Sequence, residues 1–300
     1  MKDLLSIHDI SLYQFHTLMD LSRELKRNAR KFRQHMQNRI LAVLFKNSLF
    51  EIKTGFEAGW LQMDGKIIHI SYADISADMQ KDSWSIGKHL EKWADAIITV
   101  DLGHGFISEL ARACSIPVIN GKSDLFYPCQ ALAEILTLKE KKGDLAHAKL
   151  SYMDSDISHC HSLILASAKT GMEVTVLISE SFDPGAEIIE KAREDGAGSG
   201  FRLILTEDPV QAVKNADVIY LPVNFRESKK GEQRNSLPQK SGSIVSLAEP
   251  DALIMCGSPW KGTPKNKNEK IDSTRSIMLE VADNKLHVQK AIMILLLLDK

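Results

Sequence analysis

Apolar segments of strand length alternate with segments of helical spacing along most of this chain. Ile40–Phe45, Lys66–Ser71 and Ala96–Val100 are short apolar runs, and each precedes a stretch with apolar residues at helical intervals. Strands that alternate with helices in this way favour a parallel sheet covered by helices on both faces. The sequence therefore predicts an α/β fold.

The alternation pauses once and then restarts, which predicts two domains. A strand is expected at Ile116–Ile119 before the pause. Lys141–Asp144 is polar and contains a glycine, and new candidates follow it, among them a helix at Leu163–Thr170 and a strand at Val218–Leu221. We place the domains at residues 1–142 and 143–276, each a parallel sheet flanked by helices. Leu286–Leu298 is an apolar helix with few polar residues, so it must be buried against another part of the protein. We expect the segment 277–300 to pack back on the first domain.

Composition excludes several classes of protein. The 300 residues carry 38 Lys and Arg against 39 Asp and Glu, a formal net charge of −1, which argues against a nucleic-acid surface driven by bulk charge. The four cysteines form no C-x-x-C pair, and the longest apolar run, Ala291–Leu298, is too short to cross a bilayer. Because the N-terminus also has no apolar signal core, we expect a cytoplasmic protein with reduced thiols and no membrane or nucleic-acid partner.

Two polar segments have a structural and a functional interpretation. Ser11 is a possible N-cap of a helix whose apolar spacing begins at Leu12. The basic stretch Lys26–Arg39 runs on from this helix and is a solvated helix face or a ligand site, and we favour the first. Asp154, Asp156, His159 and His161 are residue types that bind divalent metals, but their spacing matches no common metal motif. We favour a solvated loop or helix cap there, and predict no metal site.

Two long polar segments interrupt the second half of the chain. Asn224–Ser243 and Lys261–Asn268 each follow a strand, at the carboxyl end where open α/β sheets place ligands. Long loops of this kind are often lids or binding loops, or are simply mobile. The sequence leaves these alternatives open.

One segment carries a family resemblance. Ile116–Leu138 reads I-P-V-I-N-G-K-S-D-L-F-Y-P-C-Q-A-L-A-E-I-L-T-L. It resembles the aspartate/ornithine carbamoyltransferases, and most closely the ornithine branch, which carries V-I-N-G-x-x-D-x-x-H-P-C-Q-A-L-A-D. Further family motifs are similar at Phe56–Gly59, Gly103–His104, Ala216–Tyr220 and Asn284–Ala291, so the resemblance extends over nearly the whole chain.

This resemblance implies a two-domain α/β protein, usually a homotrimer. In such proteins the first domain binds carbamoyl phosphate and the second binds the amino acid. An amine attacks the carbamoyl carbon and phosphate leaves, without a metal or organic cofactor. A dianionic substrate must be held by cations and by helix-terminal N–H groups, and its carbonyl oxygen must be polarised.

The positions that correspond to the family's phosphate-binding loop carry other residues. The pattern F-x-K-P-S-T-R-T-R-x-S-F-E aligns without a gap, and its S-T-R-T-R positions are Leu49, Phe50, Glu51, Ile52 and Lys53. Lys53 keeps a positive charge, but as a point charge rather than a planar fork. Glu51 brings a carboxylate towards a phosphate. The resemblance therefore implies weakened binding of carbamoyl phosphate.

Other substrate-binding positions of the first domain also differ. The arginine that ends the family's third strand is Val100 here, and the family's H-P-C-Q is Tyr127 to Gln130. Gln130 can still hydrogen-bond a carbamoyl amide, and the Tyr127 hydroxyl can donate without a charge near pH 7. The alternative is a strand-to-helix corner kept for its backbone shape. Tyr127 and Gln130 are catalytic candidates, and Lys53, His104 and Gln130 are candidate substrate-binding residues.

The amino-acid-binding half departs from the family as well. The family's pair of asparagines is absent, and the aspartate that would pair with an ornithine ammonium is Pro222. The position of the family's reactive cysteine is Gly257, with Cys256 beside it as a third catalytic candidate. Ser158 and Lys261 complete the candidate substrate-binding residues.

Three hypotheses follow for function. The first is a carbamoyltransferase-like protein that lacks the standard reaction with ornithine and acts as a subunit partner or binding protein. The second is an enzyme of this fold with an altered, less anionic substrate. The third is an active ornithine carbamoyltransferase with a rearranged site, forming L-citrulline and phosphate from carbamoyl phosphate and L-ornithine.

Overall fold

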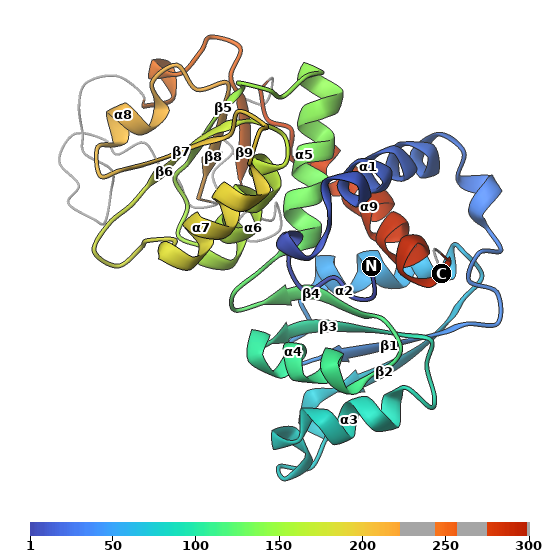
Figure 1. The fold of residues 1–300 in the computed structure, drawn as a ribbon. Helices are drawn as coiled ribbons and strands as arrows, with labels where there is room; N and C mark the ends of the chain where they lie inside the picture. Colours follow the sequence, from blue (N-terminus) through green and yellow to red (C-terminus); the bar gives the residue numbers. More distant parts are fainter. Residues whose placement is uncertain (223–243, 257–274, 299–300) are drawn as a thin grey trace, which may run out of the picture. The chain divides into compact units, whose positions relative to one another are not determined.

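The computed structural model describes residues 1–222, 244–256 and 275–298. It confirms an α/β protein with two parallel sheets flanked by helices (Figure 1). Contacts between residues divide the chain into two compact units. Unit 1 comprises Met1–Leu136, Ile157–Ala166 and Ala282–Lys300, and unit 2 comprises Thr137–Asp156 and Ser167–Val281. The sequence predicted a first domain of residues 1–142 with the segment 277–300 packed back on it. In the structure the first segment of unit 1 ends at Leu136, the last begins at Ala282, and Ile157–Ala166 is included as well.

The first sheet contains strands β1 to β4, which lie in the order β2-β1-β3-β4 and are all parallel. Their bounds are β1 Ile40–Phe45, β2 Lys66–Ser71, β3 Ala96–Leu102 and β4 Val118–Ser123. The sheet has an irregular register at the end of β3, on either side of Val100. The sheet's carboxyl edge is the side on which parallel α/β sheets place ligands.

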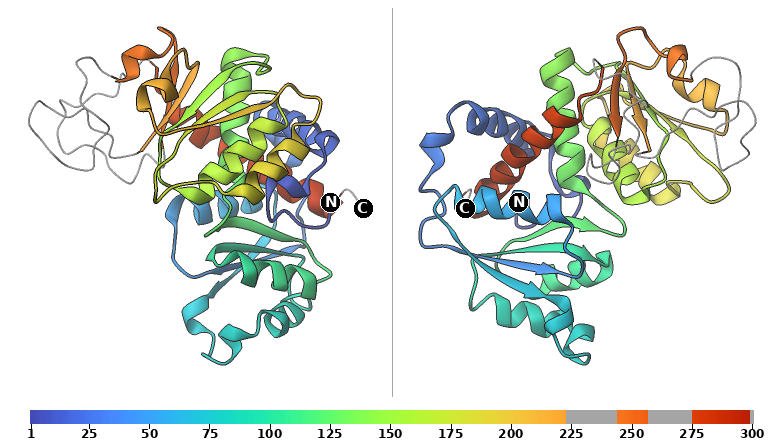
Figure 2. Two further views of the ribbon diagram at one scale, coloured as in Figure 1. Left: turned by 60° about the vertical axis from the view of Figure 1, so that its left-hand side comes forward. Right: turned by 180° about the vertical axis from the view of Figure 1, so that it is seen from behind.

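Helices cover both faces of this sheet. The helices that belong to unit 1, in whole or in part, are α1 Leu12–Arg27, α2 Phe50–Leu61, α3 Ser83–Leu90, α4 His104–Ala113, α5 Pro128–Lys142, α6 Ile157–Ala168 and α9 Met278–Leu298. Figures 1 and 2 show α3 and α4 on one face of the sheet and α2 and α9 on the other. The side with α3 and α4 forms an apolar core that includes Leu44, Ile97 and Leu110. Buried residues on both faces explain why β1 is a continuous apolar run.

The second sheet contains five parallel strands in the order β7-β6-β5-β8-β9. Their bounds are β5 Lys149–Tyr152, β6 Glu173–Leu177, β7 Arg202–Thr206, β8 Val218–Leu221 and β9 Leu253–Cys256. Helices α7 Ala186–Asp195 and α8 Pro209–Val213 belong to the same unit. Val213 of α8 and Val245 pack with Ile219 and Ile254 in an apolar cluster on this sheet.

Short 3₁₀ helices connect several of these elements: Ile7–Asp9, Ala29–Phe32, Tyr72–Asp74, Met79–Lys81 and Ile244–Leu247. Of the helices in the described ranges, none combines the length and the apolar character that crossing a membrane requires.

Two elements differ from their predicted bounds for physical reasons. The strand expected at Ile116–Ile119 begins instead at Val118 and runs on to Ser123. Pro117 has no N–H for the ladder, and the polar residues after Ile119 still pair with β3. The helix expected from Leu163 begins at Ile157, because His159 and His161 are buried in the helix and do not lie in a solvated loop.

Candidate functional site

The carboxyl edge of the first sheet leads into α2, whose first turn carries a carboxylate. Helix α2 begins at Phe50, directly after Leu49, which provides no side-chain cap. A helix N-terminus favours negative charge and is a common place for a phosphate. Here Glu51 lies in that first turn, so the chain supplies its own negative charge at this end of the helix.

Lys53 points towards groups of its own unit. Its Nζ lies 3.6 Å from Glu57 Oε1 and 4.1 Å from the centre of the Phe45 ring. Glu57 Oε1 also lies 2.7 Å from His69 Nε2. The Glu57 carboxylate therefore offsets part of the one positive charge that the aligned loop retains.

The end of β3 carries no cation at the aligned position. Val100 is completely buried in the sheet, and the next residue, Asp101, has a φ of 61°. Asp tolerates this left-handed conformation better than most residues. Asn47 Nδ2, which follows β1, donates to Asp101 Oδ2 at 2.6 Å. Strand β3 thus ends in a carboxylate that is tied to the loop after β1.

His104 lies at the start of α4, and its contacts hold the corner between β3 and α4. Its backbone N–H donates to Asp124 Oδ1 at 2.7 Å, so a carboxylate caps this helix. The ring Nδ1 lies 3.5 Å from Ser123 Oγ, and the ring packs edge-on against Phe126 at 4.9 Å. These contacts give the backbone and ring of His104 a structural role at this corner.

Tyr127 and Lys285 form a buried pair. Lys285 Nζ, on α9, donates to Tyr127 Oη at 2.6 Å, and the nitrogens of Lys285 and Lys122 lie 5.1 and 5.0 Å from the centre of the Tyr127 ring. Burial lowers the pKa of Lys285 to about 8, although the negative charges of Glu51 and Glu134 oppose this shift. Two ammonium groups are thus gathered around one phenol ring.

Gln130 belongs to a second buried group beside this pair. Gln130 Nε2 donates to Glu134 Oε1 at 2.8 Å, and Glu134 Oε2 lies 2.7 Å from His159 Nε2. The His159 and Tyr127 rings approach edge-on at 6.4 Å. The Gln130 amide that would meet a carbamoyl group therefore has a partner within the chain.

The remaining sequence candidates make other contacts. Ser158 is buried in α6, and its carbonyl oxygen accepts from the backbone N–H of Tyr127 at 3.1 Å. Cys256 is buried in unit 2, with its sulfur 2.9 Å from Met278 Sδ. Lys261 and both long loops, 224–243 and 261–268, lie outside the described residues.

The residues proposed as an alternative metal group are used elsewhere. His161 Nδ1 lies 3.1 Å from the Leu125 carbonyl oxygen, and His159 pairs with Glu134. Asp154 Oδ1 accepts from the backbone N–H of Ser155. In the described ranges no cluster of three or more His, Cys, Asp or Glu side chains is arranged to hold a metal ion.

Sequence reasoning missed Lys285 and Glu134, although both left a signal. Glu134 lies four residues after Gln130 in an otherwise apolar helix, and side chains at that spacing meet on one face. Lys285 precedes the apolar segment Leu286–Leu298 on the same helix. A polar residue on the buried face of a helix indicates a buried partner.

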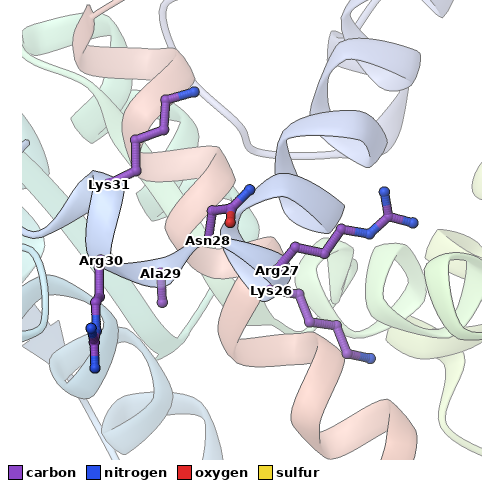
Figure 3. A pocket seen from close by; sticks show the side chains of 6 residues that line it. All are labelled: Lys26, Arg27, Asn28, Ala29, Arg30 and Lys31. Carbon is purple, nitrogen blue, oxygen red and sulfur yellow. The ribbon is translucent and has the colours of Figure 1, made fainter.

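A separate pocket lies at the end of α1. It is lined by the consecutive residues Lys26–Lys31, and Figure 3 shows their side chains pointing in different directions. Lys31 Nζ lies 3.3 Å from Glu24 Oε1, and Lys26 Nζ donates to Asn284 Oδ1 at 2.7 Å. The basic side chains do not converge on one point, which supports the solvated-face interpretation of this segment.

Comparison with known proteins agrees with the fold. Residues 2–140 match the family described as aspartate/ornithine carbamoyltransferase, carbamoyl-P binding domain. Residues 148–296 match the corresponding Asp/Orn binding domain. The ornithine carbamoyltransferase of Bacillus subtilis is 34% identical over 297 residues, covering 97% of this chain and 92% of that protein.

Other relatives show the same pattern. The ornithine carbamoyltransferase of Pyrococcus abyssi is 31% identical over 303 residues, covering 99% of this chain and 96% of the relative. The solved structure of the enzyme from Pyrococcus furiosus superposes with a TM-score of 0.87 at 28% identity, covering 99% and 97% of the two chains.

Proposed function

The chain belongs to the aspartate/ornithine carbamoyltransferase family, and from that premise we propose that it keeps the scaffold but lacks the standard carbamoyl transfer to ornithine. The observation that carries this proposal is the charge at the carboxyl edge of the first sheet. Glu51 lies in the first turn of α2, Glu57 holds Lys53, and Val100 is part of the core.

The size of the effect supports the proposal. A hydrogen bond to a charged group contributes roughly 1.5–3 kcal/mol. Losing several such bonds and adding a carboxylate costs on the order of 5 kcal/mol, which is a loss of several thousand-fold in affinity. Carbamoyl phosphate is a dianion, so this site would bind it poorly at ordinary concentrations.

A second candidate is an enzyme with an altered substrate. It is favoured by the buried polar groups of unit 1, where Tyr127, Lys285, Gln130, Glu134 and His159 lie in two hydrogen-bonded sets. Buried polar groups cost free energy unless they are paired. A less anionic ligand than carbamoyl phosphate would suit a cluster in which lysines and carboxylates balance.

Assembly and location belong to the same proposal. Family resemblance supports a homotrimer with a small-molecule ligand. The four cysteines are buried and form no disulfide, which supports a cytoplasmic location.

A citrulline assay with carbamoyl phosphate and L-ornithine tests the proposal. The Bacillus subtilis enzyme is the positive control, and a variant with S-T-R-T-R at positions 49–53 is the matched test of the loop. We expect no citrulline above background from the wild-type chain. Turnover near that of the control enzyme would show instead that the third hypothesis, an active enzyme with a rearranged site, is right.

Thermal-shift measurements separate the two remaining candidates. A panel of phosphate-bearing and neutral metabolites is screened against the wild-type protein. A clear rise in melting temperature with one neutral or singly charged compound supports an altered substrate. The absence of a rise across a broad panel supports a subunit partner or binding protein.

A further inference from the structure

Lys285 is a buried cation whose partner is a neutral group. Its side chain is 5% exposed, and the ammonium donates to the Tyr127 hydroxyl at 2.6 Å. The negative charge of Glu51 acts on Lys285, and Glu134 pairs with His159 Nε2 at 2.7 Å. A buried ammonium has three N–H groups to satisfy, and buried charges are usually paired with opposite charge. The neutral Tyr127 hydroxyl therefore takes a place at the Lys285 ammonium that suits an anionic oxygen.

Tyr127 is held firmly in the position that fills this place. Its backbone N–H donates to the Ser162 hydroxyl at 2.8 Å and to the Ser158 carbonyl at 3.1 Å. Two lysines approach its ring: the Lys122 nitrogen lies 5.0 Å and the Lys285 nitrogen 5.1 Å from the ring centre. Because the backbone and the ring are both fixed, the hydroxyl stays directed at Lys285.

We propose that Tyr127 determines which ligands unit 1 accepts, because its hydroxyl occupies the Lys285 ammonium in place of an anionic oxygen and so excludes small oxyanions of the phosphate class. This inference rests on the proposed function and gives it a second cause besides the altered loop at positions 49–53. The loop removes cations, whereas Tyr127 occupies a cation that remains. Tyr127 is in this sense a positioning residue that acts through Lys285.

Removal of the one hydroxyl tests the role of Tyr127. Tyr127→Phe keeps the ring and deletes the group that Lys285 contacts, and Tyr127→His also shortens the side chain. The matched control is Tyr152→Phe, since Tyr152 is also buried, in unit 2, and its hydroxyl donates to the Asp156 carbonyl at 2.9 Å. Inorganic phosphate is the probe, and its affinity is measured by isothermal titration calorimetry. Thermal denaturation checks that each variant is folded.

We expect phosphate to bind roughly tenfold to a hundredfold more tightly to at least one Tyr127 variant than to the wild type. Tyr152→Phe should leave the affinity unchanged. Adding Lys285→Met to the Tyr127 variant should abolish the gain. In an NMR titration of the lysine side chains, phosphate should raise the pKa of Lys285 in the Tyr127 variant, a shift that a purely structural role would not produce.

Two results would overturn the inference. One is equal phosphate affinity in the wild type and in both Tyr127 variants. The other is a gain that survives Lys285→Met, because the anion would then bind elsewhere. Either result leaves the proposed function intact, whereas citrulline formation by the wild-type chain would contradict the proposed function without involving Tyr127.

Discussion

Lys285 places an amino group in the apolar interior of unit 1, and its cost to stability depends on pH. Burial lowers its pKa from 10.5 to about 8. Below pH 8 the folded and unfolded chains both carry the proton, so the full cost of the buried charge is present. Between pH 8 and 10.5 the unfolded chain binds more protons than the folded one, so this group makes stability rise with pH.

Lys285→Met removes this pH dependence. Relative to the variant, the free energy of unfolding of the wild type should rise by on the order of 3 kcal/mol between pH 8 and pH 10.5. Urea denaturation at several pH values measures both proteins, and the difference cancels groups that titrate in both. Parallel pH profiles would contradict the expectation.

Individual side chains show where sequence reasoning reaches its limit. Tyr127 and Gln130 could be placed at a strand-to-helix corner because the motif around them is local. Their partners Lys285 and Glu134 could not, since Lys285 is 158 residues from Tyr127 in the chain and only folding brings the two together. Glu51 could be identified as a poor neighbour for phosphate, but its influence on Lys285 could not.

Helix α1 shows how a few local residues define an element. Ser11 Oγ accepts from the backbone N–H of Gln14 at 3.2 Å, and Gln14 Oε1 accepts from the backbone N–H of Ser11 at 2.9 Å. These reciprocal bonds form a capping box, which satisfies N–H groups that the helix cannot. The predicted N-cap at Ser11 is thereby confirmed.

Ser11→Ala should therefore destabilise the protein by about 1 kcal/mol. Thr17→Ala is the control in the same helix, because its hydroxyl bonds back to the Tyr13 carbonyl and such a bond contributes little to a helix. Chemical denaturation compares the two. Equal stability of both variants would show that the cap has no measurable effect.

Helices α3 and α4 approach closely at Gly87. A Cβ built there would lie 2.9 Å from Cys114 Sγ, 3.0 Å from Ala113 Cβ and 3.2 Å from the Leu110 carbonyl oxygen. Two of these atoms belong to the rigid partner helix or its end, so they cannot move aside freely. The glycine therefore allows the two helices to pack against the same face of the sheet.

Gly87→Ala should lower stability by about 1–2 kcal/mol, because overpacking outweighs the better helix propensity of alanine. Gly105→Ala in α4 is the matched control, as a Cβ there would meet no atom within 4 Å. It should leave stability unchanged or raise it by up to about 1 kcal/mol. A stabilising effect at Gly87 would show that α3 and α4 can separate at little cost.

The spacing of apolar residues predicts the bounds of strands better than it predicts the residue at which a helix begins. Strands β1, β2 and β8 have the predicted bounds. Strands β1 and β8 are short buried runs, and β2 is the edge strand of its sheet. Helix α6 starts six residues earlier than the apolar pattern indicates. Its first turns carry buried histidines and serines, whose polar groups are stabilised by hydrogen bonds, so an apolar pattern does not reveal them.

The whole molecule depends on its last helix. Val288, Ala291, Ile292 and Met293 of α9 are completely buried, and the helix belongs to unit 1. Burying an apolar side chain of this size contributes roughly 1.5–3 kcal/mol. Together these contributions are comparable with the free energy of unfolding of a whole domain, which is usually about 5–15 kcal/mol.

A chain that ends at residue 281 should therefore lose the fold of unit 1 and keep that of unit 2. Hydrogen exchange followed by mass spectrometry would show fast exchange in β1 to β4 and protection in β5 to β8. Ile292→Asp in the full chain is a second route to the same state, since it buries a charge. Protection of β1 to β4 in both proteins would mean that α9 is dispensable.

The two α/β parts were accessible from the sequence, but the place of Ile157–Ala166 in unit 1 was not. Alternating strands and helices predicted two α/β parts, and the restart after residue 144 located the change between them. The spacing of apolar residues predicts which segments are strands or helices, but it does not show which earlier part of the chain a later segment packs against. The packing of Ile157–Ala166 with unit 1 therefore became visible only in three dimensions.

The interrupted layout of unit 1 also sets an order of events during synthesis. Residues up to 281 complete unit 2, but unit 1 still lacks the segment from Ala282 onward. At about 5–20 residues per second, the ribosome needs roughly ten to thirty seconds to go from the end of β4 to that helix. For that time one face of the nascent sheet has α2 but lacks α9, and it is then a natural target for chaperones.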